Sequence, residues 1–298
     1  MYTGIINMYK PRGMTSHDVV YRMRKITGQK KIGHTGTLDP EAEGVLPVCL
    51  GSATRLCELL GEGTKQYRAV MLLGLTTDTQ DVYGTVLSQR EVCCSEEQIP
   101  EVLSHFLGNI VQIPPMYSAV KYQGKKLYQL ARKGIEVERS GREVTIEQLR
   151  LDKLELPELT MTVTCSRGTY IRTLCNDIGE KLGCGGCMKQ LIRTRVKEFT
   201  LEDALTLEEA AVLHEQGKLE EHIIPPDAFY PDAPKAGVHR EDQIRLTNGN
   251  PFRKRQIILQ EKGKGWPEYL RFYDENGGFV GLYKWDKRGL YRPEKMFI

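Results

Sequence analysis

The segment from Thr160 to Cys165 alternates threonine with larger apolar residues, and this pattern constrains the local fold more sharply than any other in the chain. Met161, Val163 and Cys165 occupy every second position. In an extended chain these three side chains point to one face and the threonines to the other. The segment therefore predicts a β-strand with one buried face.

A helical period follows this strand. From about Tyr170, the apolar residues Leu174, Ile178 and Leu182 are spaced by four, and Gly183 ends the run. Further strands are expected at 4–8, 45–50, 66–75 and 84–91. Further helices are expected from Ser16 as N-cap to the stop at Gly28, at 95–106, at 125–133, and from a capping box that begins at Thr206. Strands and helices intermix without a regular βαβ order, so we predict an α+β fold with a mixed, mostly antiparallel sheet and flanking helices.

A domain boundary is expected near residue 233, where prolines at 225, 226, 231 and 234 stiffen the chain. Short strands are predicted beyond it at 256–260, 269–273 and 279–285, with turns at Asn248-Gly249 and around 276–278. We therefore predict a large domain over residues 1–233 and a small β-rich domain over 234–298.

Charge is unevenly distributed, although the net charge is only +3. Residues 10–34, 113–143 and 235–298 carry local charges of +6, +4 and +6, whereas residues 200–232 carry −8. Basic stretches balanced by an acidic one are typical of a protein that binds a polyanion on one face. Charged clusters of this size also occur on ordinary protein surfaces, so the charge distribution alone does not establish nucleic-acid binding.

Several classes of function have no support in the sequence. GxxxxGK[ST], GxGxxG, HExxH and GxSxG motifs are all missing. Cys184 and Cys187 have the spacing of half a zinc site, but no second pair completes it, so we expect no metal and no cofactor. The longest apolar runs fall well short of the roughly 18 residues that a membrane span needs. The N-terminus lacks the pattern of a secretory signal, so we expect a cytoplasmic protein with reduced cysteines.

Two short segments carry the candidate chemistry. Asp39 lies in a glycine-rich loop, Gly33-His-Thr-Gly-Thr-Leu-Asp-Pro-Glu-Ala-Glu-Gly44, which leads into an apolar strand. An Asp-Pro pair can also be an ordinary turn. Arg172 occupies the first turn of a helix, where a cation opposes the helix dipole, so an anionic partner is expected.

These segments resemble a known family. The loop 33–44, Lys65-Gln-Tyr67, the stretch from Tyr117 to Tyr128 and Arg167-Gly-Thr-Tyr-Ile-Arg172 occur in the order found in bacterial tRNA pseudouridine-55 synthases, the TruB family of pseudouridine synthases. The resemblance extends over about residues 4 to 200. It implies the pseudouridine synthase fold and an isomerase that converts uridine 55 of the tRNA TΨC loop to pseudouridine without metal or cofactor.

The resemblance also implies roles for particular residues. Asp39 matches the catalytic nucleophile, which attacks either C1′ of the ribose or C6 of the base, and Arg172 matches its ion-pair partner. Tyr67 matches a tyrosine that stacks on the target base. The remaining matches in and near the pocket are Tyr170, Leu191 and the RNA-contacting His34.

RNA contacts are expected beyond the pocket. The insertion at about 113–143 matches a segment that grips RNA, so Lys125 and Lys126 are expected to hold phosphates, as is Lys10 of the first basic stretch. The C-terminal part resembles a PUA-like RNA-binding domain, and the family suggests a monomer that binds the TΨC stem-loop without an obligate protein partner. Glu41 and Glu43 depart from the family pattern and are expected to point to solvent. Two alternatives stay open: a non-catalytic RNA-binding or tRNA chaperone protein on the same fold, and a pseudouridine synthase for a different RNA site.

Overall fold

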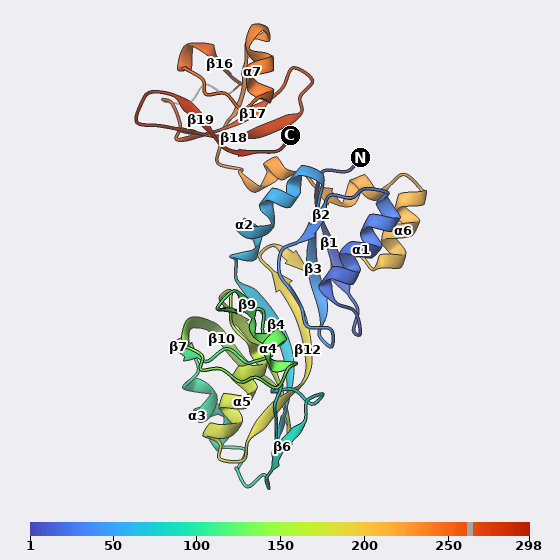
Figure 1. Ribbon diagram of the computed structural model, residues 1–298, viewed down its shortest axis with the longest axis vertical. Helices are drawn as coiled ribbons and strands as arrows, with labels where there is room; N and C mark the ends of the chain where they lie inside the picture. The colour runs from blue at the N-terminus through green and yellow to red at the C-terminus, as the bar shows by residue number, and fades with distance from the viewer. Residues whose placement is uncertain (261–264) are drawn as a thin grey trace.

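A long, mostly antiparallel sheet forms the framework of the protein (Figure 1). The computed structural model describes residues 1–260 and 265–298. Eight strands follow one another in the order β14-β1-β3-β12-β4-β11-β10-β7, with β2 on β3 and β13 on β12. Within this sheet β12 and β3 pair in parallel, and the other pairings are antiparallel. This confirms the predicted mixed, mostly antiparallel sheet with helices. The strands are β1 (Gly4–Lys10), β2 (Ile32–His34), β3 (Glu43–Leu50), β4 (Lys65–Leu73), β7 (Gly108–Gln112), β10 (Arg142–Glu155), β11 (Glu158–Cys165), β12 (Gly186–Val196), β13 (Phe199–Thr200) and β14 (Ile223–Ile224).

The alternating segment forms β11, as predicted. Met161, Val163 and Cys165 are fully buried. Their face packs against helices α3 (Gln98–Ser104) and α5 (Ile171–Lys181), within one cluster that also contains Ile99 and Leu174. The opposite half of the sheet carries α1 (Ser16–Thr27) and α6 (Leu207–Glu215), which contact each other. The two ends of the sheet therefore have separate cores.

The helix termini follow the predicted signals with one correction. Gly28 ends α1 in the left-handed conformation, and the capping box at Thr206 begins α6. The N-cap of α1 is Thr15, however, and not Ser16. The Thr15 hydroxyl accepts a hydrogen bond from the amide of Asp18, whereas Ser16 is buried and bonds elsewhere. Two adjacent hydroxyl residues offered the same cap, and tertiary packing decided between them.

The insertion at 113–143 differs from its predicted secondary structure. Lys125–Lys126 form strand β9, which pairs with β8 (Lys121–Tyr122), and the helix α4 covers only Leu127–Ala131. Positive φ angles at Gln123 and Gly124 turn the chain between the strands. The tight turn therefore replaces the first part of the predicted helix with a hairpin.

The remaining helices and strands of the large sheet region are short. The predicted strand at 66–75 divides into β4 and β5 (Leu75–Thr77), and β5 pairs with β6 (Val86–Gln89). The segment after β3 forms a 3-10 turn and then α2 (Cys57–Gly61).

A second sheet follows the proline-rich segment, as predicted. Its order is β16-β15-β17-β18-β19, and it encloses its own aromatic core around Phe252, Phe272 and Tyr283. The strands are β15 (Lys235–Val238), β16 (Ile257–Leu259), β17 (Tyr269–Tyr273), β18 (Phe279–Trp285) and β19 (Tyr291–Met296), with α7 (Gln243–Thr247) between β15 and β16. The predicted strands correspond to β16, β17 and β18, and β15 and β19 were not predicted.

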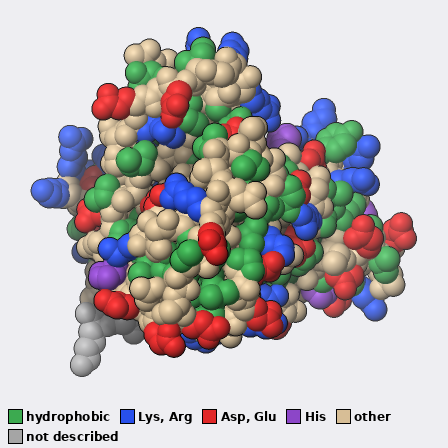
Figure 2. Space-filling model, turned by 90° about the horizontal axis from the view of Figure 1, so that it is seen from below, with side chains coloured by type: hydrophobic (Ala, Val, Ile, Leu, Met, Phe, Trp, Pro, Cys, Tyr) green, Lys and Arg blue, Asp and Glu red, His purple; other side chains and the backbone are tan. Residues whose placement is uncertain are grey.

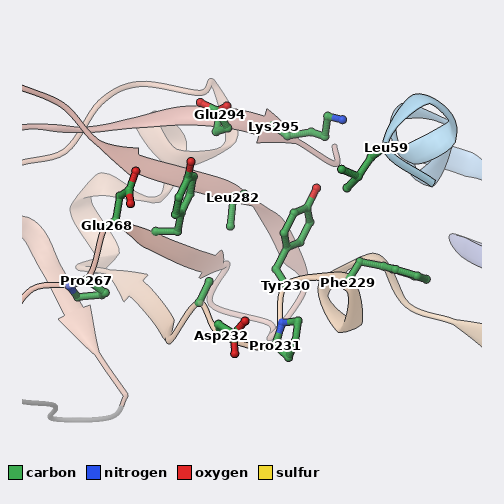
Figure 3. Close-up of a pocket in the computed structure, with 12 residues that line it drawn as sticks. Leu59, Phe229, Tyr230, Pro231, Asp232, Pro267, Glu268, Leu282, Glu294 and Lys295 are labelled. Carbon is green, nitrogen blue, oxygen red and sulfur yellow. The ribbon is translucent and has the colours of Figure 1, made fainter. Parts of the chain in front are cut away.

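The proline-rich segment packs against both sheets. The ring of Phe229 lies 6.3 Å from that of Phe199 on β13, and the ring of Tyr230 lies 6.3 Å from that of Phe297 after β19. Phe229 and Tyr230 also line a cavity of about 520 Å³, together with Leu59 of α2 and residues near the second sheet (Figure 3). Among residues 1–260 and 265–298, no helix has the length and apolar character that crossing a bilayer requires.

Candidate active site

The loop between β2 and β3, residues 35–42, carries Asp39 and is fastened at the residue before it. The Ser16 hydroxyl accepts a hydrogen bond from the Leu38 amide at 2.8 Å and donates to the Leu38 carbonyl at 3.2 Å. Ser16 and Leu38 are both buried. The first residue of α1 therefore fixes the backbone that leads into Asp39.

The residue after Asp39 is held as well. The Pro40 carbonyl accepts hydrogen bonds from the Gly13 amide at 2.9 Å and from the Lys10 ammonium at 3.1 Å. The Ala42 amide donates to the Asp39 carbonyl at 3.1 Å, which closes a turn. Asp39 thus lies on a backbone anchored on both sides, as a catalytic group requires if it is to stay in a fixed geometry.

Gly44 lets the loop join the sheet closely. It has a φ of +109°, and a Cβ atom there would lie 2.3 Å from the carbonyl oxygen of Arg193 on β12. The buried Arg193 side chain in turn donates to the carbonyls of Val45 at 2.8 Å and Gly36 at 3.1 Å. The parallel pairing of β3 with β12 therefore depends on this glycine.

Asp39 and Arg172 form an ion pair, with 3.1 Å between Oδ2 and Nε. The Arg172 side chain is 8% exposed and that of Asp39 is 43% exposed. The guanidinium also donates to the backbone carbonyls of Thr79 at 3.1 Å and Tyr117 at 3.0 Å. The arginine is thus fixed from several directions, while the carboxylate stays accessible to a substrate.

Sequence reasoning missed a second carboxylate at the same arginine. Asp81 Oδ2 lies 3.4 Å from Arg172 Nη1. Burial raises the pKa of the Asp81 carboxyl, and hydrogen bonds from the Thr79 hydroxyl and from Arg172 act in the opposite direction. A guanidinium has five N–H donors, so an arginine expected to be buried needs more acceptors than one aspartate supplies. The number of N–H donors on Arg172, together with the acidic residues that follow β5, could therefore have indicated a second carboxylate partner.

The expected base-contacting residues lie on three adjoining elements. Tyr67 on β4 and Leu191 on β12 are each 8% exposed and share one apolar cluster with Leu38. Tyr170 is the N-cap of α5, and its backbone amide and carbonyl are both held by the Gln112 side chain. The structure therefore brings Tyr67, Leu191 and the Asp39 loop together.

Tyr67 lies against an unusual neighbour. The buried Arg193 guanidinium lies close to the Tyr67 side chain. Burial raises the pKa of Tyr67, and the Arg193 charge acts in the opposite direction. Burial thus keeps the phenol protonated although a positive charge lies nearby.

His34 ends β2 with its ring largely enclosed. Burial, followed by the positive charge of Arg193, lowers the pKa of His34, so the ring is neutral at pH 7. Its Nδ1 is buried and has no hydrogen-bond partner among the described residues.

Lys10 is placed differently from the expectation that it contacts RNA. Its side chain is fully buried, and its ammonium donates to the carbonyls of Pro11, Met14 and Pro40. Burial lowers the pKa of Lys10 to about 8, against the attraction of Asp39 and the nearby glutamates. In this arrangement the Lys10 ammonium stabilises the backbone of the Asp39 loop and is not accessible to a phosphate.

The two glutamates of the loop, Glu41 and Glu43, are both partly exposed. Glu41 forms an ion pair with Arg12 at 3.1 Å. Burial, together with the nearby Glu43 carboxylate, raises the pKa of Tyr9 to about 12. Both side chains therefore keep part of their surface in solvent, and the charge of Glu41 is balanced by Arg12.

The insertion meets the site through its backbone, because the Tyr117 carbonyl accepts a hydrogen bond from Arg172. Lys125 and Lys126 are exposed on β9. On the face of the molecule seen in Figure 2, basic and acidic side chains are interspersed, so the charge pattern of the sequence does not become a single-sign surface there.

The cysteines and the cavity lie outside this site. All eight cysteines are free, and no group of three or more potential metal ligands occurs within the described part of the chain. Cys184 and Cys187 are buried on either side of the turn that leads into β12. None of the sequence-predicted residues lines the cavity in Figure 3.

Comparison with known proteins gives consistent matches. Residues 24–171 match the model of the TruB family pseudouridylate synthase N-terminal domain, and residues 172–229 match the tRNA pseudouridylate synthase B C-terminal domain. The chain is 47% identical over 305 residues to tRNA pseudouridine synthase B of Lachnoclostridium phytofermentans, covering 99% of each chain. It is 48% identical over 255 residues to the protein of that name from Alkaliphilus oremlandii, covering 86% of this chain and 84% of the relative.

A solved structure shows the same fold. The matching chain in a Cbf5-Nop10-Gar1 complex superposes with a TM-score of 0.70 at 29% identity, covering 99% of this chain and 85% of the other. The second sheet, over residues 235–296, lies beyond the residues that the two family models match.

Proposed function

This chain belongs to the TruB family of pseudouridylate synthases, and on that premise we propose that it converts uridine 55 in the TΨC loop of tRNA to pseudouridine. The reaction breaks the bond between N1 of uracil and C1′ of the ribose, turns the base, and joins C5 to C1′. C5 loses its proton and N1 gains one, so the product is an isomer of the substrate. The observation that carries the proposal is the ion pair of Asp39 with Arg172 on an anchored loop beside Tyr67.

Asp39 acts as the nucleophile in this proposal. Its Oδ2 is paired with Arg172, and the exposed fraction of its side chain leaves room for a nucleotide. Attack at C1′ and attack at C6 both need an ionised carboxylate in a site that closes over the substrate, and a guanidinium supplies the counter-charge. Arg172 stays oriented during the reaction because Asp81 and two backbone carbonyls also hold it.

The target base enters by leaving the folded loop of the RNA. Tyr67 stacks on the flipped base, and Tyr170 and Leu191 complete its apolar surroundings. His34 contacts the RNA loop from which the base has left, and the partial exposure of its side chain at the end of β2 is compatible with this role.

The RNA body is held by the remaining basic regions. Within a catalytic domain at 1–233, the insertion 113–143 grips the stem-loop through Lys125 and Lys126, which lie exposed on a hairpin. The domain at 234–298 is a PUA-like RNA-binding domain, consistent with its local charge of +6. The protein works as a cytoplasmic monomer in this proposal.

Release of tritium from tRNA that carries 5-tritiated uridine tests the reaction. Wild-type protein releases tritium in proportion to pseudouridine formed, and Asp39→Asn releases none. Absence of release by the wild type would favour the non-catalytic RNA-binding alternative, as would undiminished release by Asp39→Asn. Mapping the product nucleotide by the reverse-transcription stop at a chemical adduct then distinguishes position 55 from another RNA site.

A further inference from the structure

Three partly exposed side chains from separate segments meet at the Asp39 loop, and we call them the Arg12 cluster: Arg12, Glu41 and Tyr83. The Arg12 Nε lies 3.1 Å from the Glu41 carboxylate. The same guanidinium lies over the Tyr83 ring, 5.2 Å from its centroid. Tyr83 is 48% exposed, and the side chains of Arg12 and Glu41 are 48% and 42% exposed.

The backbone fixes this cluster to the catalytic groups. Glu41 is two residues beyond Asp39, and the Gly13 amide beside Arg12 donates to the carbonyl of Pro40. The Tyr83 amide donates at 3.0 Å to Oδ1 of Asp81, the carboxylate whose Oδ2 faces Arg172. The backbone therefore joins the cluster to the Asp39 loop and to the loop that holds Arg172.

The internal contacts of the cluster are of the kind that a ligand can replace. An exposed ion pair is weak, because water competes for both charges and the two side chains lose freedom. A guanidinium donates to a phosphate with the same planar fork that it offers to a carboxylate. An aromatic ring beneath the guanidinium keeps the fork oriented while the partner changes. The Arg12 side chain is exposed, so burial does not stabilise its ion pair with Glu41. The Arg172 side chain, in contrast, is buried in its ion pair with Asp39.

We propose that Arg12, seated on Tyr83, is a phosphate-binding site for the RNA strand that delivers the target nucleotide, and that Glu41 occupies the site in the free protein. This inference rests on the proposed function, because it assigns the phosphodiester of that substrate as the ligand. On binding, the guanidinium exchanges the Glu41 carboxylate for a phosphate oxygen next to the flipped nucleotide. A ligand therefore has to compete with the Glu41 carboxylate for Arg12, which favours a polyanion such as RNA.

The test measures binding of a fluorescein-labelled TΨC stem-loop RNA by anisotropy at several KCl concentrations, in an Asp39→Asn background that prevents turnover. Arg12→Ala should weaken binding about tenfold, because a charge-assisted hydrogen bond to phosphate is lost. It should also reduce the slope of log K against log salt by about 0.7 to 0.9, as expected for one phosphate contact. Tyr83→Ser should lose part of the same affinity, whereas Tyr83→Phe should retain it.

Glu41→Gln tests the masking directly. It should tighten binding about two- to fivefold, the range expected for an exposed ion pair. The gain should largely disappear when Arg12→Ala is also present, because the masked group is then gone. An equal gain with and without Arg12 would mean that Glu41 acts only through overall charge, and would overturn the masking.

Arg90 and Glu180 provide the matched control. They form an exposed ion pair at 3.2 Å, with side chains 43% and 46% exposed. Arg90 directly follows β6, Glu180 lies on α5, and neither residue belongs to the Arg12 cluster. Arg90→Ala and Glu180→Gln should leave RNA affinity within twofold of the parent and the slope of log K against log salt unchanged. The inference fails if Arg12→Ala behaves like Arg90→Ala. Tritium release by the wild type is scored separately, so loss of the proposed function and loss of this site are distinguishable.

Discussion

Replacing Ser16 by alanine should slow the reaction without preventing folding. Ser16 contacts no substrate in the proposed function, but its hydroxyl bonds to both the amide and the carbonyl of Leu38, the residue before Asp39. The side chain is 2% exposed, so water does not readily replace the lost hydroxyl. The substitution therefore leaves two buried backbone groups without their partner.

The size of the effect follows from these contacts. A buried donor left unpaired costs about 1–3 kcal/mol, and the longer bond to the carbonyl adds less, so we expect a loss of about 2 kcal/mol in the free energy of unfolding. Part of this cost will be relieved by movement of the loop. A displacement of about 1 Å in a catalytic group can cost a hundredfold in rate, so the single-turnover rate should fall between about tenfold and a hundredfold.

Thr15→Ala is the matched control, because it removes the N-cap of the same helix and leaves Leu38 untouched. Losing such a cap costs about 0.5–2 kcal/mol, similar to the loss expected for Ser16→Ala. Urea unfolding measures stability, and tritium release with enzyme in excess over tRNA measures the chemical step. The reasoning is refuted if Ser16→Ala and Thr15→Ala lose similar stability and also react within twofold of each other.

Further predictions concern the arginine, the buried lysine and the loop glycine. Asp81→Asn places an amide N–H toward the Arg172 donors, because Oδ1 already accepts bonds from Thr79 and Tyr83. The single-turnover rate should therefore fall at least tenfold, while tRNA affinity stays unchanged. A parallel loss of affinity would contradict this prediction. The pKa of Lys10 is about 8 in the native protein and 10.5 in the unfolded chain, so the unfolded chain binds more protons between these pH values and stability should rise there. Lys10→Met should flatten that rise in urea unfolding at pH 7.5 and about pH 10, and an unchanged difference between the two pH values would exclude Lys10 as its source. Gly44→Ala should lower the free energy of unfolding by about 3 kcal/mol or more, because of strain at positive φ and the clash with the Arg193 carbonyl. A loss below about 1 kcal/mol in the same assay would show that β3 and β12 can move apart enough to accept a Cβ atom.

Local patterns predicted the regular elements well where one signal dominated. The threonine alternation gave β11, Gly28 gave the end of α1, and Thr206 gave the start of α6. Prediction failed where two local signals competed, as with the adjacent hydroxyls at 15 and 16. It also failed at Lys125–Lys126, where a tight turn favours a hairpin over the start of a helix. Local preferences are small, so nearby contacts decide such cases.

The candidate site divides in the same way. The sequence alone indicated Asp39 as a carboxylate on a glycine-rich loop, and predicted that Arg172, at the start of a helix, needs an anion. These two residues lie far apart in the chain, and the structure joins them at 3.1 Å. The predicted meeting of Tyr67 and Leu191 with that loop follows from strands β4 and β12 being neighbours in the sheet.

By itself, the sequence determined the chemical types available to the protein: a carboxylate, a cation to balance it, aromatic rings, and basic segments without the signature of a common cofactor. Only the tertiary structure decided which charges are buried and which face solvent. Lys10 and Arg12 are two residues apart, yet Lys10 is enclosed under the loop while Arg12 lies exposed on Tyr83. Sequence patterns record a charge but not its surroundings, and the cost of removing that charge from water depends entirely on those surroundings.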